Sequence, residues 1–240
     1  MVENFKITAY QLKRKLNISV YLPNDYNDSN RNYPVFYLLD GERFFHSLDN
    51  LKQEFDLPSL IDNENLNIII VGLHNPSIPE WRISELNPYY KKDSTSVDAE
   101  LGKIFSNYLA NDLKEVLNQR YRISNDNFYL ISFDDAANQA IYSLYHQSIF
   151  KGISLFSPDF SKSDFEPILD DIYHNMKIGK KIFIFNGGLD GINHKILRLK
   201  EKFDELKIDN YYLNNNFENN NFNFQKKHII ESIEYLLKRD

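Results

Sequence analysis

The sequence predicts an α/β fold with one central, mostly parallel β-sheet and helices on both of its faces. After residue 66, apolar runs suited to buried strands alternate with segments of helical periodicity. The runs at 34–41, 67–73 and 181–188 are almost continuously apolar, as strands covered on both faces are. The chain has 240 residues, 42% of them hydrophobic, which is enough for a substantial core. Because no linker or repeat interrupts the pattern, we expect a single domain over residues 1–240.

The N-terminal part is expected to add antiparallel strands at one edge of the sheet. In "KLNISVYLP", residues 15–23, every second residue is apolar, which is typical of a strand with one buried side. The polar segment 24–33 predicts a turn before the apolar strand at 34–41.

The rest of the chain supplies the alternation of strands and helices. Residues 98–121 give the clearest helix, because their apolar residues recur at helical spacing. The Asn-rich segment 214–224 predicts a loop. The other expected elements are strands at 127–132, 152–157, 181–188 and 210–213, and helices at 135–148, 162–176, 192–207 and 225–239.

Composition and charge exclude several classes of function. The net charge is −6 and no basic block is present, which argues against nucleic acid and against anionic membranes. The absence of cysteine excludes disulfides, thiolate catalysis and zinc–thiolate sites. No stretch resembles a signal peptide or a membrane span, so we expect a cytoplasmic protein. The scattered histidines and the lack of a glycine-rich phosphate loop predict neither a metal nor a cofactor. The oligomeric state is left open.

The carboxyl ends of predicted strands, where open parallel sheets bind ligands, lie at 38–45, 71–88, 131–138 and 186–194, and four motifs lie at or near three of these ends. They are "YPVFYLLDGERFF" at 33–45, "VGLHN" at 71–75, "R.SELNP" at 82–88 and "GGLD" at 187–190. In this order and spacing they resemble the esterase family of α/β-hydrolases, which includes esterase D, enterochelin esterase and the mycolyltransferases. The resemblance covers nearly the whole chain and implies an α/β-hydrolase fold. It also implies a serine in a Gly-x-Ser-x-Gly-Gly elbow, an aspartate after a later strand and a histidine before the last helix.

Three parts of the family's site have counterparts in this sequence. The resemblance implies that Asp190 is the acid, although an aspartate there could also cap the next helix. Asp40 and Gly41 match the oxyanion loop, and we expect Gly41 to let the chain turn sharply off its strand. Arg82 and Glu85 match the "R.SEL" motif, where they would brace a loop over the cleft, bind substrate or form an ion pair.

The elbow departs from the family, because the segment that should carry the serine reads "SFDDAA". One alignment register places Phe133 at the serine position. The other places Asp134 there, with two alanines in place of the glycines. Ser132 lies one or two residues before the family's serine position. We expect its hydroxyl to bond to the backbone at the strand end, and Ser132 is the fallback candidate for the nucleophile. Asp134 could also attack through its carboxylate, but a helix N-terminal residue favoured by the helix dipole is the preferred interpretation.

The histidine of the family is also replaced. Aligning the aromatic residues before the last helix places Asn220 at the histidine position, and an amide cannot act as a general base near neutral pH. His74, at a strand end, and His228, in the final helix, are the fallback bases. For His228 we expect a surface or helix-packing role.

Three functions remain open. The favoured one is a catalytically inactive or strongly impaired esterase relative that binds a small-molecule ester or a protein partner, because serine, elbow glycines and histidine are all replaced. The second is an active carboxylic-ester hydrolase or acyltransferase with a rearranged site that uses Ser132. The third is a protein-interaction module whose old cleft is plugged by Phe133.

Overall fold

The computed structural model contains one eight-stranded sheet in the order β1-β2-β4-β3-β5-β6-β7-β8. It describes residues 1–45, 56–91, 98–175, 177–187, 193–215 and 222–238. β1 pairs antiparallel with β2, and β2 pairs antiparallel with β4, whereas all other neighbours are parallel. The strands are Val2–Ala9 (β1), Arg14–Tyr21 (β2), Tyr33–Leu39 (β3), Ile69–Leu73 (β4), Ile123–Phe133 (β5), Phe150–Phe156 (β6), Lys181–Gly187 (β7) and Asp209–Asn215 (β8). The predicted α/β fold with a mostly parallel sheet is confirmed.

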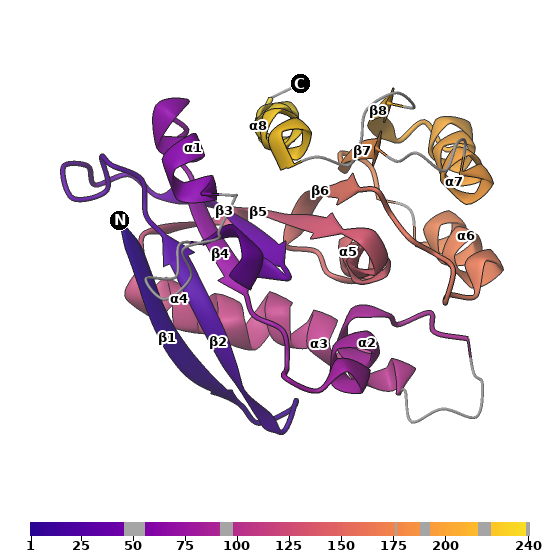
Figure 1. Ribbon diagram of the computed structural model, residues 1–240, viewed down its shortest axis with the longest axis horizontal. Coiled ribbons are helices and arrows are strands. Elements are labelled where there is room, and N and C mark those ends of the chain that lie inside the picture. Colours follow the sequence, from indigo (N-terminus) through magenta and orange to yellow (C-terminus); the bar gives the residue numbers. More distant parts are fainter. Residues whose placement is uncertain (46–55, 92–97, 176, 188–192, 216–221, 239–240) are drawn as a thin grey trace.

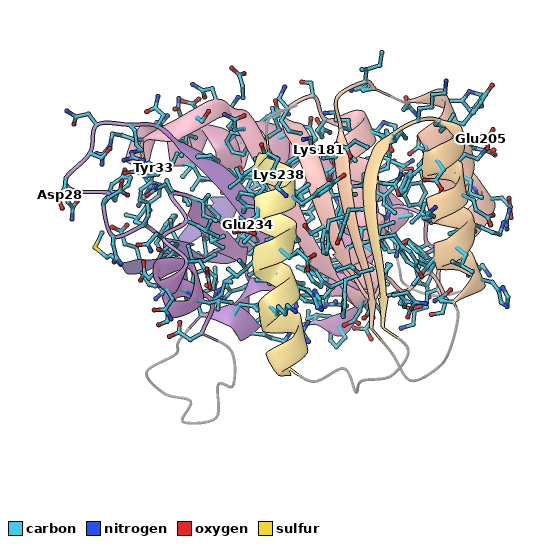
Figure 2. The ribbon with its side chains drawn as sticks, turned by 90° about the horizontal axis from the view of Figure 1, so that it is seen from above. Asp28, Tyr33, Lys181, Glu205, Glu234 and Lys238 are labelled. Atoms are coloured by element: carbon cyan, nitrogen blue, oxygen red, sulfur yellow. The ribbon has the colours of Figure 1, made fainter. Side chains whose placement is uncertain are left out.

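Helices cover both faces of the sheet (Figure 1). α1 and α8 lie on one face, and α2 to α7 lie on the other. Figure 2 shows α8 crossing its face of the sheet, where Lys181 Nζ donates to the carbonyl of Lys238 at 2.6 Å. The α-helices are Leu57–Asn63 (α1), Pro79–Leu86 (α2), Ala99–Tyr108 (α3), Lys114–Arg120 (α4), Ala137–His146 (α5), Phe165–His174 (α6), His194–Glu205 (α7) and Phe222–Leu237 (α8), with short turns at Gly41–Phe44 (η1), Leu109–Leu113 (η2) and Asp134–Ala136 (η3).

The alternation of side chains along the central strands builds two separate cores. In β3, Val35 and Tyr37 face the core under α3 to α7, and Phe36 and Leu38 face the core under α1 and α8. Both sets are completely buried, which explains why the sequence run is continuously apolar rather than alternating.

The long predicted helix at 98–121 is interrupted. Its middle, Leu109–Leu113, is a π-helical turn between α3 and α4. The buried hydroxyl of Tyr37 donates to the carbonyl of Leu109 at 3.3 Å, so a side chain from the sheet satisfies a carbonyl at this irregular turn. The amphipathic pattern predicted the helical stripe, but this contact with a distant strand could not be read from it.

No helix in the part of the chain that the structure describes is both long and apolar enough to cross a membrane.

Candidate functional site

The turn between β5 and α5 is the point at which an α/β-hydrolase carries its nucleophile. Asp134 makes this turn, with a φ of 50°. A left-handed backbone is uncommon for residues other than glycine, and aspartate tolerates it better than most. Asp134 is exposed, whereas Phe133 is the last residue of β5 and is buried. Of the two alignment registers, the one that places Asp134 at the serine position fits this backbone.

The ring of Phe133 is part of a row of aromatic rings on the α8 side of the sheet. It stacks on Phe44 at 4.8 Å and on Phe156 at 4.9 Å between ring centroids. The row continues from Phe156 to Phe185 at 5.9 Å and from Phe185 to His228 at 4.6 Å. Phe133 is 3% exposed, so these rings fill the space beside the turn with hydrocarbon.

The carboxylate of Asp134 lies in a mixed electrostatic field. Partial loss of water raises the pKa of Asp134, and the nearby carboxylates of Asp135 and Asp40 raise it further. Arg43 and Arg82 oppose this rise through their positive charges. The turn therefore presents an exposed acid to solvent, where the family's catalysts present a neutral hydroxyl.

Arg82 of α2 ties the turn to the loop after β3. Its guanidinium donates to both carboxylate oxygens of Asp40, at 2.9 and 2.6 Å. It also donates to both oxygens of Asp135, at 3.0 and 2.8 Å. Four of the five N–H donors of Arg82 are thus used on protein carboxylates, so Arg82 braces the site.

The loop after β3 turns for a different reason than the sequence predicted. The expectation that Gly41 provides the sharp turn is wrong, because the left-handed residue is Asp40, with a φ of 57°. Gly41 is needed for space instead, since a Cβ there would lie 2.4 Å from the Cα of Gly72 in β4. The close approach of η1 to β4 thus requires a glycine.

Ser132 lies within β5, one residue before the last residue of the strand. It is fully buried, and its hydroxyl donates to the carbonyl of Ser154 in β6 at 3.1 Å. Among the described residues, no histidine is hydrogen-bonded to Ser132 or to Asp134. The hydroxyl of Ser132 is thus hydrogen-bonded to the backbone of the neighbouring strand and is not accessible to solvent.

His74 follows β4 and contacts the antiparallel edge of the sheet. Its Nε2 lies 2.8 Å from the hydroxyl of Ser19, which itself donates to Oδ1 of Asn4 at 2.5 Å. Nε2 therefore carries the proton that Ser19 accepts. Burial lowers the pKa of His74, although Glu42 opposes this. His74 is held by Ser19 of β2, which is in turn held by Asn4 of β1.

His228, the other fallback base, belongs to α8 and is buried. Its Nδ1 lies 2.8 Å from the carboxylate of Glu231, and its ring stacks on Phe185. Three ring-to-ring contacts separate it from Phe133.

The two remaining family positions, Asp190 and Asn220, lie outside the described residues. Glu85 is described and does not pair with Arg82. It accepts from Arg14 at 2.6 Å through each oxygen, and both side chains are buried. No cluster of three or more acidic, histidine or cysteine side chains suited to a metal ion occurs within the described ranges.

Sequence reasoning missed Asp135 as a site residue. It was assigned only to the start of a helix, but its carboxylate is the second partner of Arg82. The only signal was a second aspartate after the strand, together with an arginine in "R.SEL" that needed an acidic partner.

The sheet order, the covering helices and the sharp turn after β5 define the class of protein. The chain is an α/β-hydrolase in architecture. The family described as "Putative esterase" matches residues 9–205. The chain belongs to this esterase family, as its motifs predict.

Three solved structures illustrate the similarity. An IroE-like serine hydrolase from Shewanella oneidensis is 19% identical, with a TM-score of 0.74 over 98% of this chain and 79% of that one. The BES protein from Bacillus cereus is 16% identical, with a TM-score of 0.74 over 99% and 95% of the two chains. An S-formylglutathione hydrolase from Agrobacterium tumefaciens is 15% identical, with a TM-score of 0.70 over 98% and 95%. At such identities these structures support the fold alone. A search of curated proteins by sequence gave no match.

Proposed function

We propose that this chain is a catalytically inactive or strongly impaired member of the esterase family that retains a binding role. One observation carries the proposal: the left-handed turn after β5 bears the carboxylate of Asp134 in place of a hydroxyl. Acyl transfer by this family depends on an oxygen nucleophile that gives up its proton to a base.

The surroundings of the turn support the same conclusion. Ser132 is the nearest hydroxyl in the sequence, and it is buried and bonded to Ser154. His74 and His228 each have other partners, Ser19 and Glu231. Because nucleophile and base act as a unit, the loss of either removes most of the rate enhancement.

A protein-interaction module is the second candidate, and the aromatic row favours it. Phe133 and its stacked neighbours fill the space beside the turn, and in this candidate function they plug the family's cleft. A module of this kind would bind a partner over its surface and not in a cleft at the turn.

Ester hydrolysis tests the proposal directly. Purified protein is assayed on p-nitrophenyl acetate and butyrate, beside the variants Ser132→Ala and Asp134→Asn. We expect the three proteins to give the same rate as buffer. A turnover that persists through successive purification steps and disappears in Ser132→Ala would overturn the proposal in favour of a rearranged esterase.

A fluorophosphonate probe gives a second readout that is independent of turnover. We expect no covalent labelling of the parent protein. The variant Asp134→Ser supplies a hydroxyl at the turn, and we expect it to stay unlabelled because a hydroxyl without a base remains protonated. Labelling of this variant would show that a base already faces the turn, and the claim that the base is lost would then be wrong.

A further inference from the structure

A groove of about 670 Å³ lies on the face of the sheet that α2 to α7 cover, and Asp134 is not among the residues that line it. Its walls come from α5, α6 and the segment 88–91 after α2, and one lysine of α3 lies at its border. Figure 1 shows α5 between α3 and α6 on this face. The volume falls within the range of about 300–1,000 Å³ that holds small-molecule ligands.

The groove contains a preformed polar network around Asp171 of α6. His146 of α5 places Nε2 at 2.8 Å from both oxygens of this carboxylate, and Asn175 donates to it at 2.6 Å. The hydroxyl of Tyr89 donates to the same carboxylate. Partial burial raises the pKa of Asp171, but the hydrogen bonds from His146, Tyr89 and Asn175 outweigh this and lower it. Asp171 is therefore an ionised, fully engaged part of the wall.

Aromatic rings provide an apolar surface above this network. Tyr142 stacks on His146, with ring centroids 4.0 Å apart and planes 18° apart, and meets Tyr89 edge-on at 5.8 Å. Tyr90 and Tyr142 both line the groove and are half-buried. Such rings bind planar groups through stacking and edge contacts.

The rim carries charges of both signs, and three of these side chains have no partner among the residues that the structure describes. Lys91 is exposed and forms no ion pair with any described residue, whereas Lys103 of α3 pairs with Glu100 at 2.5 Å. Asp164, at the N-cap position of α6, and Asp170, within α6, are exposed, and their carboxylates form no hydrogen bond or ion pair within the described part of the chain. A ligand that satisfies this rim needs both an anionic and a cationic group.

We propose that this groove binds a small zwitterion with an aromatic ring, such as an aromatic amino acid or a short peptide. The ring lies against Tyr142, the carboxylate faces Lys91, and the ammonium group faces Asp164 and Asp170. The proposal does not depend on whether the turn at Asp134 hydrolyses esters, because none of its residues belong to that site.

Ligand-observed NMR with a set of matched compounds tests the proposal. We expect L-tyrosine and the dipeptide L-alanyl-L-tyrosine to show saturable binding. Tyramine lacks the carboxylate, 3-(4-hydroxyphenyl)propionate lacks the ammonium group and L-leucine lacks the ring, so all three should bind more weakly. The stronger of the first two ligands identifies a free amino acid or a peptide as the natural source. If neither binds, or if the three partial compounds bind as tightly as L-tyrosine, the proposal is wrong.

Crossed variants locate the binding in the groove. Lys91→Gln should weaken the binding of L-tyrosine by roughly twofold to fivefold, which is the range for exposed ion pairs. The same variant should leave the binding of tyramine unchanged. Asp170→Asn should weaken the binding of L-tyrosine to a similar extent and leave the binding of 3-(4-hydroxyphenyl)propionate unchanged. Tyr142→Leu should weaken the binding of every compound that carries an aromatic ring. Lys162→Gln is the matched control, because Lys162 is an exposed lysine that does not line the groove. Binding of L-tyrosine that is unchanged in all three groove variants would overturn the proposal.

Discussion

Replacing Arg82 by methionine tests whether the double carboxylate clamp holds the turn and the loop after β3 together. Methionine keeps most of the length of the side chain and removes its charge and all four hydrogen bonds to Asp40 and Asp135. The two carboxylates, 4% and 19% exposed, would then face each other without a cation between them.

The size of the effect follows from this burial. Removing one partner of a fully buried ion pair costs about 3–5 kcal/mol, because the other charge stays buried and unpaired. The side chain of Arg82 is 24% exposed, so water compensates part of the loss. We expect the free energy of unfolding to fall by about 2–3 kcal/mol, between the values of exposed and buried pairs.

Urea unfolding at neutral pH, followed by circular dichroism, measures this change. The control is Arg198→Met, since Arg198 makes a similar two-point contact to Glu166 with side chains 50% and 66% exposed. We expect no measurable shift of its midpoint. The triple variant Arg82→Met, Asp40→Asn, Asp135→Asn should recover part of the lost stability, because it removes the unpaired charges. If Arg82→Met unfolds at the same urea concentration as the parent protein, the clamp does not stabilise the site.

Three further predictions concern the two cores and one buried lysine. Tyr145→Phe should raise the free energy of unfolding by about 1 kcal/mol, because its buried hydroxyl has no hydrogen-bond partner among the described residues. Tyr37→Phe should lower it, because that hydroxyl bonds Leu109, and a destabilised Tyr145→Phe would contradict the reasoning. Phe133→Ala should cost about 3–5 kcal/mol in urea unfolding, and Phe133→Leu clearly less; equal losses would show that the stacked rings contribute nothing specific. Burial, followed by the charges of Lys177 and Lys151, lowers the pKa of Lys180 to about 8. The folded chain then binds fewer protons than the unfolded chain between about pH 8 and pH 10, so the free energy of unfolding should rise with pH in this window. Lys180→Met should remove that rise, and a rise that persists in this variant would assign it to another group.

The fold could be predicted because its strands are buried on both faces. Continuous apolar runs identified β3, β4, β6 and β7 to within about two residues, as is usual for such boundaries. β5 extends from Ile123 and not from 127, because its first part is polar and lies at the end of the sheet. The short helices α1 and α2 were not predicted. With seven and eight residues, they present too few turns for a helical period to show.

The site was harder to predict, because its geometry depends on the backbone and on distant partners. Side-chain patterns could not choose between Phe133 and Asp134, since the choice rests on which residue has a positive φ. The clamp joins Arg82 to residues 42 and 53 positions away, and no local pattern encodes such pairings. Asp190 and Asn220 remain predictions.

The left-handed turn at Asp134 persists in a chain whose turn residue is an acid. This has a practical consequence for protein engineering. A cysteine introduced there would be exposed just before α5, and the backbone of the turn would set the direction of its side chain. Its thiol could be labelled with a catalyst or a fluorophore. The fold would then hold an attached reactive group in a fixed position, on a protein expected to have little reactivity of its own at that point.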